Sequence, residues 1–157
     1  MNQIRKVKKS DLSSLKEVLD TIELFPSNML DEMISDYLYN PNSQDIWFTS
    51  TDENNKPLSI AYCAPEKLTE GTYNLYAIGV KNDIQGNGIR RKMMHFIEGQ
   101  LQKNGERILI VETSGKNEFH LTRQFYEGLN YTKEAVIRDF WEEGDDKVVY
   151  WKKLQGG

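Results

Sequence analysis

The segment with the clearest chemical potential is Gln85-Gly86-Asn87-Gly88, because its two glycines stand between a β-rich apolar run and a helical pattern. The run covers residues 72–80, and apolar residues spaced by four predict a helix from residue 89. The N-terminus of a helix carries free N–H groups and about half a positive charge, and glycines let the backbone close on an anion. The arrangement predicts a site for a phosphate or pyrophosphate group.

Two common phosphate-binding motifs do not fit this loop. The nucleotide P-loop requires Gly-x-x-x-x-Gly-Lys-Ser/Thr, which the chain lacks. The dinucleotide fingerprint Gly-x-Gly-x-x-Gly fails at its third glycine, where Arg91 stands, and the loop follows a late strand instead of opening a βαβ unit. A phosphate compound of another class is therefore expected.

Residue patterns typical of metal sites or of nucleophilic catalysis receive little support from this sequence. The two histidines, His95 and His120, lie far apart, and with one cysteine there is no pair to hold a metal, so no metal site is predicted. No Gly-x-Ser-x-Gly elbow is present. Cys63 lies in an expected strand and is interpreted as a core residue, whereas His120 remains one option for a general base.

Composition narrows the class of protein. The chain has 157 residues and a net charge of −4, from 24 acidic and 20 basic residues, which does not favour a general nucleic-acid binder. No apolar run approaches the roughly 20 residues that span a bilayer, and the first residues contain no hydrophobic signal core. We expect one cytoplasmic domain over residues 1–157, with residues 154–157 as a short tail.

Local patterns predict a mixed α/β protein with the order βααβββαβαββ. A helix capped by Ser10 or Asp11 follows the first strand, and residues 118–129 form a late helix with Leu121, Phe125 and Leu129 inward. Strands are expected at residues 3–7, 45–51, 57–64, 72–80, 107–113, 132–141 and 147–154. The strand–loop–helix–strand unit over residues 72–113 predicts a right-handed crossover between parallel neighbours, with antiparallel hairpins on both sides.

The glycine loop resembles the coenzyme A loop of the GNAT superfamily of acetyltransferases, whose pattern is Gln/Arg-x-x-Gly-x-Gly/Ala. Here that pattern reads Gln85-Gly86-Asn87-Gly88-Ile89-Arg90. A second match is the stretch from Phe125-Tyr126 to Tyr131, similar to the family's Phe-Tyr-x-x-x-Gly-Phe/Tyr, and the element order agrees along nearly the whole chain. The resemblance implies about seven mostly antiparallel strands with a central splayed parallel pair, flanked by about four helices.

By this resemblance the cosubstrate is acetyl-CoA, and no metal is needed. The end of the strand at residues 72–80 would contact the pantetheine arm, and the glycine loop would bind the pyrophosphate. The implied cofactor-binding residues are Ile78, Gly79, Val80, Gln85, Gly86, Gly88, Ile89, Arg90 and Arg91. Arg90 departs from the family's small residue, and two readings stay open: it crowds the pyrophosphate or it clasps it.

The implied reaction is direct attack of an acceptor amine on the thioester. Tyr126 matches the family's tyrosine near the coenzyme sulfur and is the candidate proton donor to the leaving thiolate. A glutamate often precedes the glycine loop in this family, but Asn74 stands at the aligned position and cannot act as a base. Glu112, near the end of the next parallel strand, is the candidate base, acting through water.

The acceptor is expected to be an amine of a small molecule or a peptide, bound between residues 24–37 and 138–146. No nucleic-acid or membrane partner is predicted, and a homodimer is possible by resemblance alone. Two other functions remain open. The first is a coenzyme A sensor without turnover, motivated by Arg90 and Asn74. The second is an interaction domain that docks a partner through Phe140 and Trp141.

Overall fold

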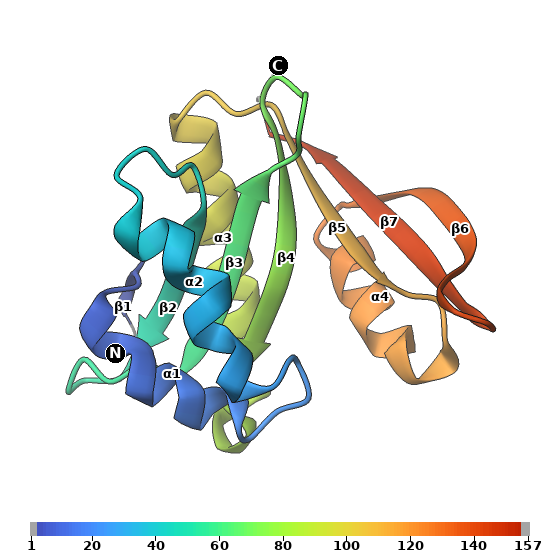
Figure 1. Ribbon diagram of the computed structural model, residues 1–157. Helices are drawn as coiled ribbons and strands as arrows, with labels where there is room; N and C mark the ends of the chain where they lie inside the picture. The colour runs from blue at the N-terminus through green and yellow to red at the C-terminus, as the bar shows by residue number, and fades with distance from the viewer. Residues whose placement is uncertain (1–2, 155–157) are drawn as a thin grey trace.

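The computed structural model describes residues 3–154, which form a seven-stranded sheet with helices on both faces (Figure 1). Its strands are β1 (Gln3–Lys6), β2 (Ile46–Thr51), β3 (Ser59–Pro65), β4 (Thr72–Val80), β5 (Ile108–Ser114), β6 (Thr132–Glu142) and β7 (Asp145–Lys153). Its helices are α1 (Leu12–Leu19), α2 (Leu30–Tyr39), α3 (Ile89–Lys103) and α4 (His120–Gly128). Among these residues no helix is both long and apolar enough to cross a membrane.

The strands lie in the order β1-β2-β3-β4-β5-β7-β6. Every neighbouring pair is antiparallel except β4 and β5, which are parallel and are connected through α3. This topology confirms the expected fold class, including its central parallel pair. The β4 boundaries agree with the sequence prediction because turn residues flank the apolar run on both sides.

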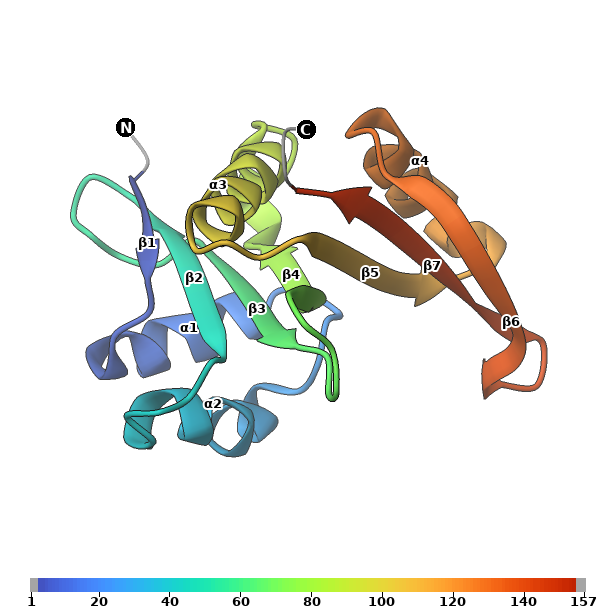
Figure 2. The ribbon, with the colours of Figure 1, turned by 90° about the horizontal axis from the view of Figure 1, so that it is seen from above.

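Two apolar cores cover the two faces of the sheet (Figure 2). On one face Met93 and Ile97 of α3 and Tyr126 of α4 pack against β4, β5 and β7. On the other face α1 and α2 pack against Trp47 and Ile60, so they cover only the half of the sheet that contains β2 and β3. The outer surfaces of β5, β7 and β6 therefore lack a helix on this second face.

The parallel pair separates halfway along its length. β4 and β5 are paired from Thr72 with Ile108 to Leu75 with Val111, and the pairing ends there although β4 continues to Val80. On its other edge β4 stays paired with β3, and the register between Tyr62 and Cys63 shifts by one residue at Tyr76. Such a bulge bends a strand and increases its twist, which is consistent with the divergence of β4 from β5 in Figure 1.

One sequence prediction about burial was wrong. Leu121 is 75% exposed, because the buried face of α4 contains Tyr126, which lies about 140° away from Leu121 around a helix with 3.6 residues per turn. Leu154, expected at the boundary between the last strand and the tail, is buried, and its N–H donates to the carbonyl of Arg107 at 2.8 Å. The rest of the predicted tail, residues 155–157, lies outside the described residues.

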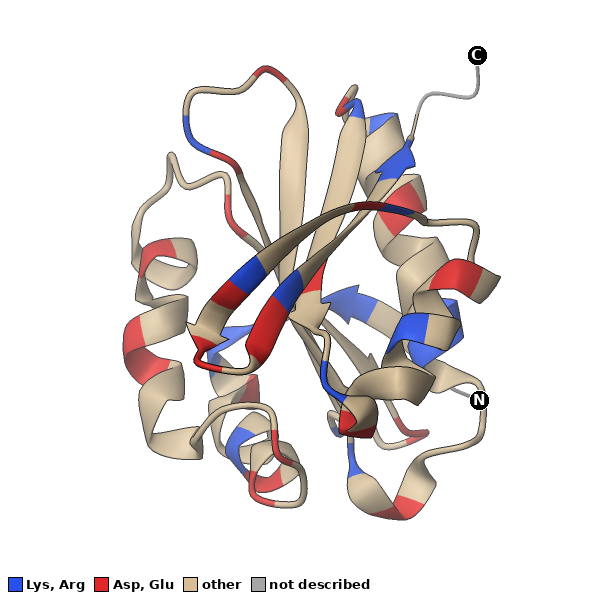
Figure 3. Cartoon of the chain, turned by 90° about the vertical axis from the view of Figure 1, so that its right-hand side faces the viewer, with Lys and Arg blue, Asp and Glu red and all other residues tan. Residues whose placement is uncertain are grey.

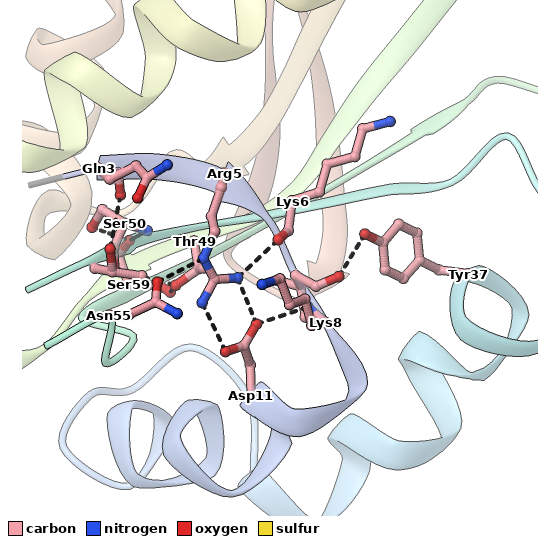
Figure 4. A network of polar contacts seen from close by, with 12 residues as sticks. Gln3, Arg5, Lys6, Lys8, Asp11, Tyr37, Thr49, Ser50, Asn55 and Ser59 are labelled. Atoms are coloured by element: carbon pink, nitrogen blue, oxygen red, sulfur yellow. Dashed lines mark hydrogen bonds and ion pairs between the residues drawn. The ribbon is translucent and has the colours of Figure 1, made fainter.

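The expected cap of α1 is also corrected, because Asp11 binds elsewhere (Figure 4). Its carboxylate accepts two hydrogen bonds from the guanidinium of Arg5, at 2.8 and 2.9 Å, and one from the N–H of Lys8 at 2.7 Å. The two side chains are only 13% and 7% exposed. Burial alone would raise the pKa of Asp11, but these hydrogen bonds outweigh it and lower the pKa.

We expect Asp11→Asn to destabilise the fold by about 2 kcal/mol, because the half-buried guanidinium of Arg5 loses its counter-charge. Urea denaturation at pH 7 measures the loss. The matched control is Asp31→Asn, which removes the exposed ion pair between Lys16 and Asp31 and should cost about 0.5 kcal/mol or less. Since the folded-state pKa of Asp11 is lowered, its contribution is complete above about pH 4 and is lost as the pH falls further. Equal stability of both variants at pH 7 would contradict this prediction.

Candidate functional site

The glycine loop adopts the backbone conformation that its residue types predict. Gly86 and Gly88 have φ angles of +85° and +77°, in the left-handed region that glycine adopts at low cost, and α3 begins directly afterwards at Ile89. Two side chains hold the loop: Gln85 Nε2 donates to the carbonyl of Val80 and Asn87 Nδ2 to that of Ile84, both at 3.0 Å. No atom lies within 4 Å of a Cβ built on either glycine, so this side of the loop is open.

A cavity of about 530 Å³ lies against this loop. All nine residues that the resemblance implied for cofactor binding line it: Ile78, Gly79, Val80, Gln85, Gly86, Gly88, Ile89, Arg90 and Arg91. The cavity thus extends from the unpaired end of β4 to the first turn of α3. The first N–H groups of a helix have no intrahelical partner, so an anion in this cavity would find free donors.

Five further residues line the same cavity and were not predicted: Ile22, Glu23, Leu24, Ile84 and Phe125. The chain between α1 and α2 passes over β4 at Gly79, where an added Cβ would lie 2.5 Å from Ile22 Cδ1 and 3.2 Å from Leu24 Cδ2. A glycine inside a strand often marks such a close approach, and this signal could have located Ile22 and Leu24. Leu24, expected in the acceptor site, therefore borders the cofactor cavity.

Arg90 is the half-buried cation of the cavity. Its guanidinium carbon lies 3.8 Å from the centroid of the Phe125 ring, a cation–π contact. Within residues 3–154 it forms no ion pair and no hydrogen bond, and burial lowers its pKa. Arg91 also lines the cavity but is exposed. A half-buried guanidinium without a carboxylate partner favours an anionic ligand.

Tyr126 is buried beside this cavity but does not line it. Its ring packs edge-to-face on Phe125 at a centroid distance of 5.2 Å and also contacts Tyr131 and Tyr150. Burial raises the pKa of Tyr126 to about 12, and the charge of Arg90 opposes part of this shift. The phenol therefore stays protonated at neutral pH, as a proton donor requires.

The two candidate bases, Glu112 and His120, are not among the residues that line this cavity. Glu112 is on β5, just beyond the paired segment, and its carboxylate accepts from Lys147 Nζ at 2.9 Å. His120 is exposed at the start of α4, and His95 is exposed on α3, 3.9 Å from Glu98. The described residues contain no group of metal-binding side chains.

Asn74 is buried on β4, at the position where the family often has glutamate. Its Nδ2 donates to Glu66 Oε1 at 2.6 Å, whereas its Oδ1 is buried without a hydrogen-bond partner in the described part of the chain. Glu66 was not among the residues predicted from the sequence. Its contact depends on the β3–β4 register, which no local pattern specifies.

Known structures share this fold, with its splayed parallel pair beside the glycine-rich start of α3. No protein-family model and no curated protein sequence matches the chain. An acetyltransferase assigned to the GNAT family from Desulfovibrio desulfuricans superposes with a TM-score of 0.90 and 26% identity, over 98% of this chain and 99% of that one.

Two more distant structures share the fold. The ribosomal-protein-S18-alanine N-acetyltransferase from Escherichia coli has a TM-score of 0.80 and 18% identity, over 100% of this chain and 96% of its own. An aminoglycoside 6'-N-acetyltransferase complexed with coenzyme A has a TM-score of 0.76 and 14% identity, over 99% and 98%. The chain shares the fold of the GNAT superfamily of acetyltransferases, as the sequence resemblance implied.

Proposed function

We propose that this chain is an N-acetyltransferase that moves the acetyl group of acetyl-CoA to an acceptor amine by direct attack. The main support for the proposal is that all nine implied cofactor residues line the same cavity. The acceptors named for the E. coli and aminoglycoside enzymes, a protein alanine and an aminoglycoside, are both amines. An amine of a small molecule or a peptide is accordingly the proposed acceptor class here.

The residues around the cavity suit the parts of acetyl-CoA. The open side of Gly86 and Gly88 leaves room for a pyrophosphate at the N-terminus of α3, and Arg90 supplies a positive charge. Beyond Leu75 one edge of β4 is not paired with β5, so its N–H and C=O groups are free to bind the pantetheine amides. Coenzyme A supplies the activated thioester, and the chain's residues position it.

The reaction needs a base and an acid. An amine with a pKa of about 10.4 is mostly protonated at pH 7, a handicap of roughly 4–5 kcal/mol for attack. Tyr126 is the proposed proton donor to the departing thiolate, because burial keeps it protonated and it lies next to Phe125 and Arg90 at the cavity. Glu112 is a candidate base, although Lys147 already neutralises its charge.

Acetyl-CoA at about 100 times its dissociation constant should stabilise the fold by roughly 2.7 kcal/mol, which raises Tm by about 5–10 °C for a chain of this size. Differential scanning fluorimetry measures the shift, and acetylpantetheine, which lacks the pyrophosphate, is the matched control and should shift Tm much less. No shift at millimolar acetyl-CoA would contradict the proposal. A shift without thiol release across a panel of amines would favour the sensor that binds without turnover.

We also propose a reducing compartment such as the cytoplasm, because Cys63 is buried and unpaired. An intracellular amine is the matching acceptor. A homodimer remains a proposal from family resemblance, and sedimentation at micromolar concentration tests it.

A further inference from the structure

On the face of the sheet opposite α3, several polar residues lie at the point where β4 and β5 separate. Asn74 is paired with Ile110, and partners in a sheet project to the same face, as do residues two apart along a strand. Asn74, Tyr76 and Glu112 therefore share one face, whereas Leu75 and Val111 point into the core beneath α3. This shared face is the one that α1 and α2 leave uncovered over β5 and β7 (Figure 2).

Glu66 reaches this face from the turn after β3. Its backbone N–H donates to the carbonyl of Thr72 at 2.8 Å, which fixes the start of the turn. Its Oε1 accepts from Asn74 Nδ2 at 2.6 Å and from the hydroxyl of Tyr76 at 3.4 Å. Its Oε2 has no partner among residues 3–154, so one carboxylate oxygen is held in place and the other is free.

Asn74 is well suited to position this carboxylate. Its side chain is 1% exposed, and its amide must present Nδ2 to Glu66 because a carboxylate oxygen only accepts hydrogen bonds. Asn74 Oδ1 is buried and lacks a partner within residues 3–154, which leaves an acceptor beside Glu66 for an N–H donor. An unpaired buried polar group of this kind is uncommon in folded proteins.

The surroundings of Glu66 favour a cation. The ring of Tyr76 is 50% exposed and stacks on Tyr62 at 5.5 Å, and the hydroxyl of Tyr62 donates to Asp45 at 3.4 Å. Burial raises the pKa of Tyr76, and the charges of Glu66 and Glu112 raise it further. Nearby α2 contributes acidic but no basic residues (Figure 3). Aromatic faces and carboxylates together attract ammonium groups.

We propose that Glu66 is the general base for the acceptor amine and that Asn74 holds it in position; this inference rests on the proposed acetyltransferase function. Glu66 accepts one proton from the acceptor ammonium, directly or over one water, and passes it to solvent. The neutral amine then attacks the thioester carbon. A C–N bond forms, the C–S bond breaks, and coenzyme A leaves as a thiolate. Tyr126 donates a proton to this thiolate and takes up in its place the second proton that the nitrogen releases.

Position and charge favour Glu66 over Glu112. Glu112 is paired with Lys147 at 2.9 Å, so its charge is compensated, whereas Glu66 contacts only neutral donors. Tyr76, which contacts Glu66, precedes the cavity residue Ile78 by two positions, or about 7 Å along a strand. Glu66 therefore supplies, from a loop, the carboxylate that Asn74 cannot.

The test compares Glu66→Gln with Glu70→Gln, a matched charge removal on an exposed residue four positions along the same turn. With acetyl-CoA and the best amine of a panel, we expect E66Q to lower kcat/KM at pH 7 by about 100-fold and E70Q to leave it unchanged. The acetyl-CoA-induced Tm shift should be the same in both variants and in the wild type. Glu66→Asp, which keeps a carboxylate, should recover part of the rate.

A pH series separates a base from a merely structural residue. Because a higher pH supplies neutral amine, the deficit of E66Q should shrink steadily from pH 7 to pH 9.5. The groups that face Glu66 are Asn74 and Tyr76 on β4 and Glu112 with Lys147 behind it, and all are retained in E66Q and E66D.

Wild-type kcat/KM in a folded E66Q, or a deficit that does not change with pH, would overturn the role of Glu66 and leave the acetyltransferase assignment standing. A wild-type protein that binds acetyl-CoA but releases no thiol with any amine would overturn both.

Discussion

Tyr126→Phe should lower kcat by about 100-fold or more while leaving the acetyl-CoA-induced Tm shift unchanged. The substitution removes only the hydroxyl, and the ring contacts with Phe125 and Tyr150 remain. Within the described residues this hydroxyl has no hydrogen-bond partner, so its loss leaves no other group unpaired. Thiol release under saturating acetyl-CoA measures the effect. Since burial raises the pKa of Tyr126 to about 12, ionisation of this residue should cause no loss of activity below about pH 10.

The matched control for Tyr126 is Tyr150→Phe, in the same aromatic cluster. The hydroxyl of Tyr150 donates to Glu127 Oε2 at 2.8 Å, so its removal should cost about 1 kcal/mol of stability but should not change kcat. If Tyr126→Phe kept the wild-type rate, Tyr126 would have only a packing role. An equal loss of rate in both variants would mean that the cluster acts through packing.

Local patterns predicted the part of the site that depends on consecutive residues. Gly88 precedes a helix whose Ile89, Met93, Ile97 and Leu101 are all buried, so spacing alone located the start and inner face of α3. The nine residues that the resemblance implied line one cavity, because the end of β4, the glycine loop and the first turn of α3 are one continuous segment. Its geometry is therefore largely set by its own residue types.

Contacts between distant segments could not be predicted in this way. Asp11 has the residue type of a helix cap, but its carboxylate instead accepts two charge-assisted hydrogen bonds from the guanidinium of Arg5. Glu66 meets Asn74 only because the hairpin register aligns Ala64 with Asn74, and this register includes a bulge at Tyr76. Register is set by packing on both faces and by the turn, neither of which a short window of sequence contains.

The sequence also left open whether Arg90 crowds or clasps the pyrophosphate, and we propose the second reading. The guanidinium carbon lies 3.8 Å from the centroid of the Phe125 ring, and both side chains line the cavity. The glycine side of the loop is open, since nothing lies within 4 Å of a Cβ on Gly86 or Gly88. Phe125 thus holds the cation beside the space where a diphosphate would lie.

Arg90→Ala should therefore raise the dissociation constant of acetyl-CoA by about 10- to 100-fold, the equivalent of one hydrogen-bonded charge contact worth about 1.5–3 kcal/mol. Calorimetric titration measures it. Arg91→Ala is the matched control: Arg91 lines the same cavity but is exposed, so we expect a change of about 5-fold or less. Arg90→Lys should lie between them, because lysine keeps the charge but loses the planar stacking on Phe125. Tighter binding in Arg90→Ala would reverse the interpretation, since it would mean that the guanidinium obstructs the phosphate site that the glycines leave open.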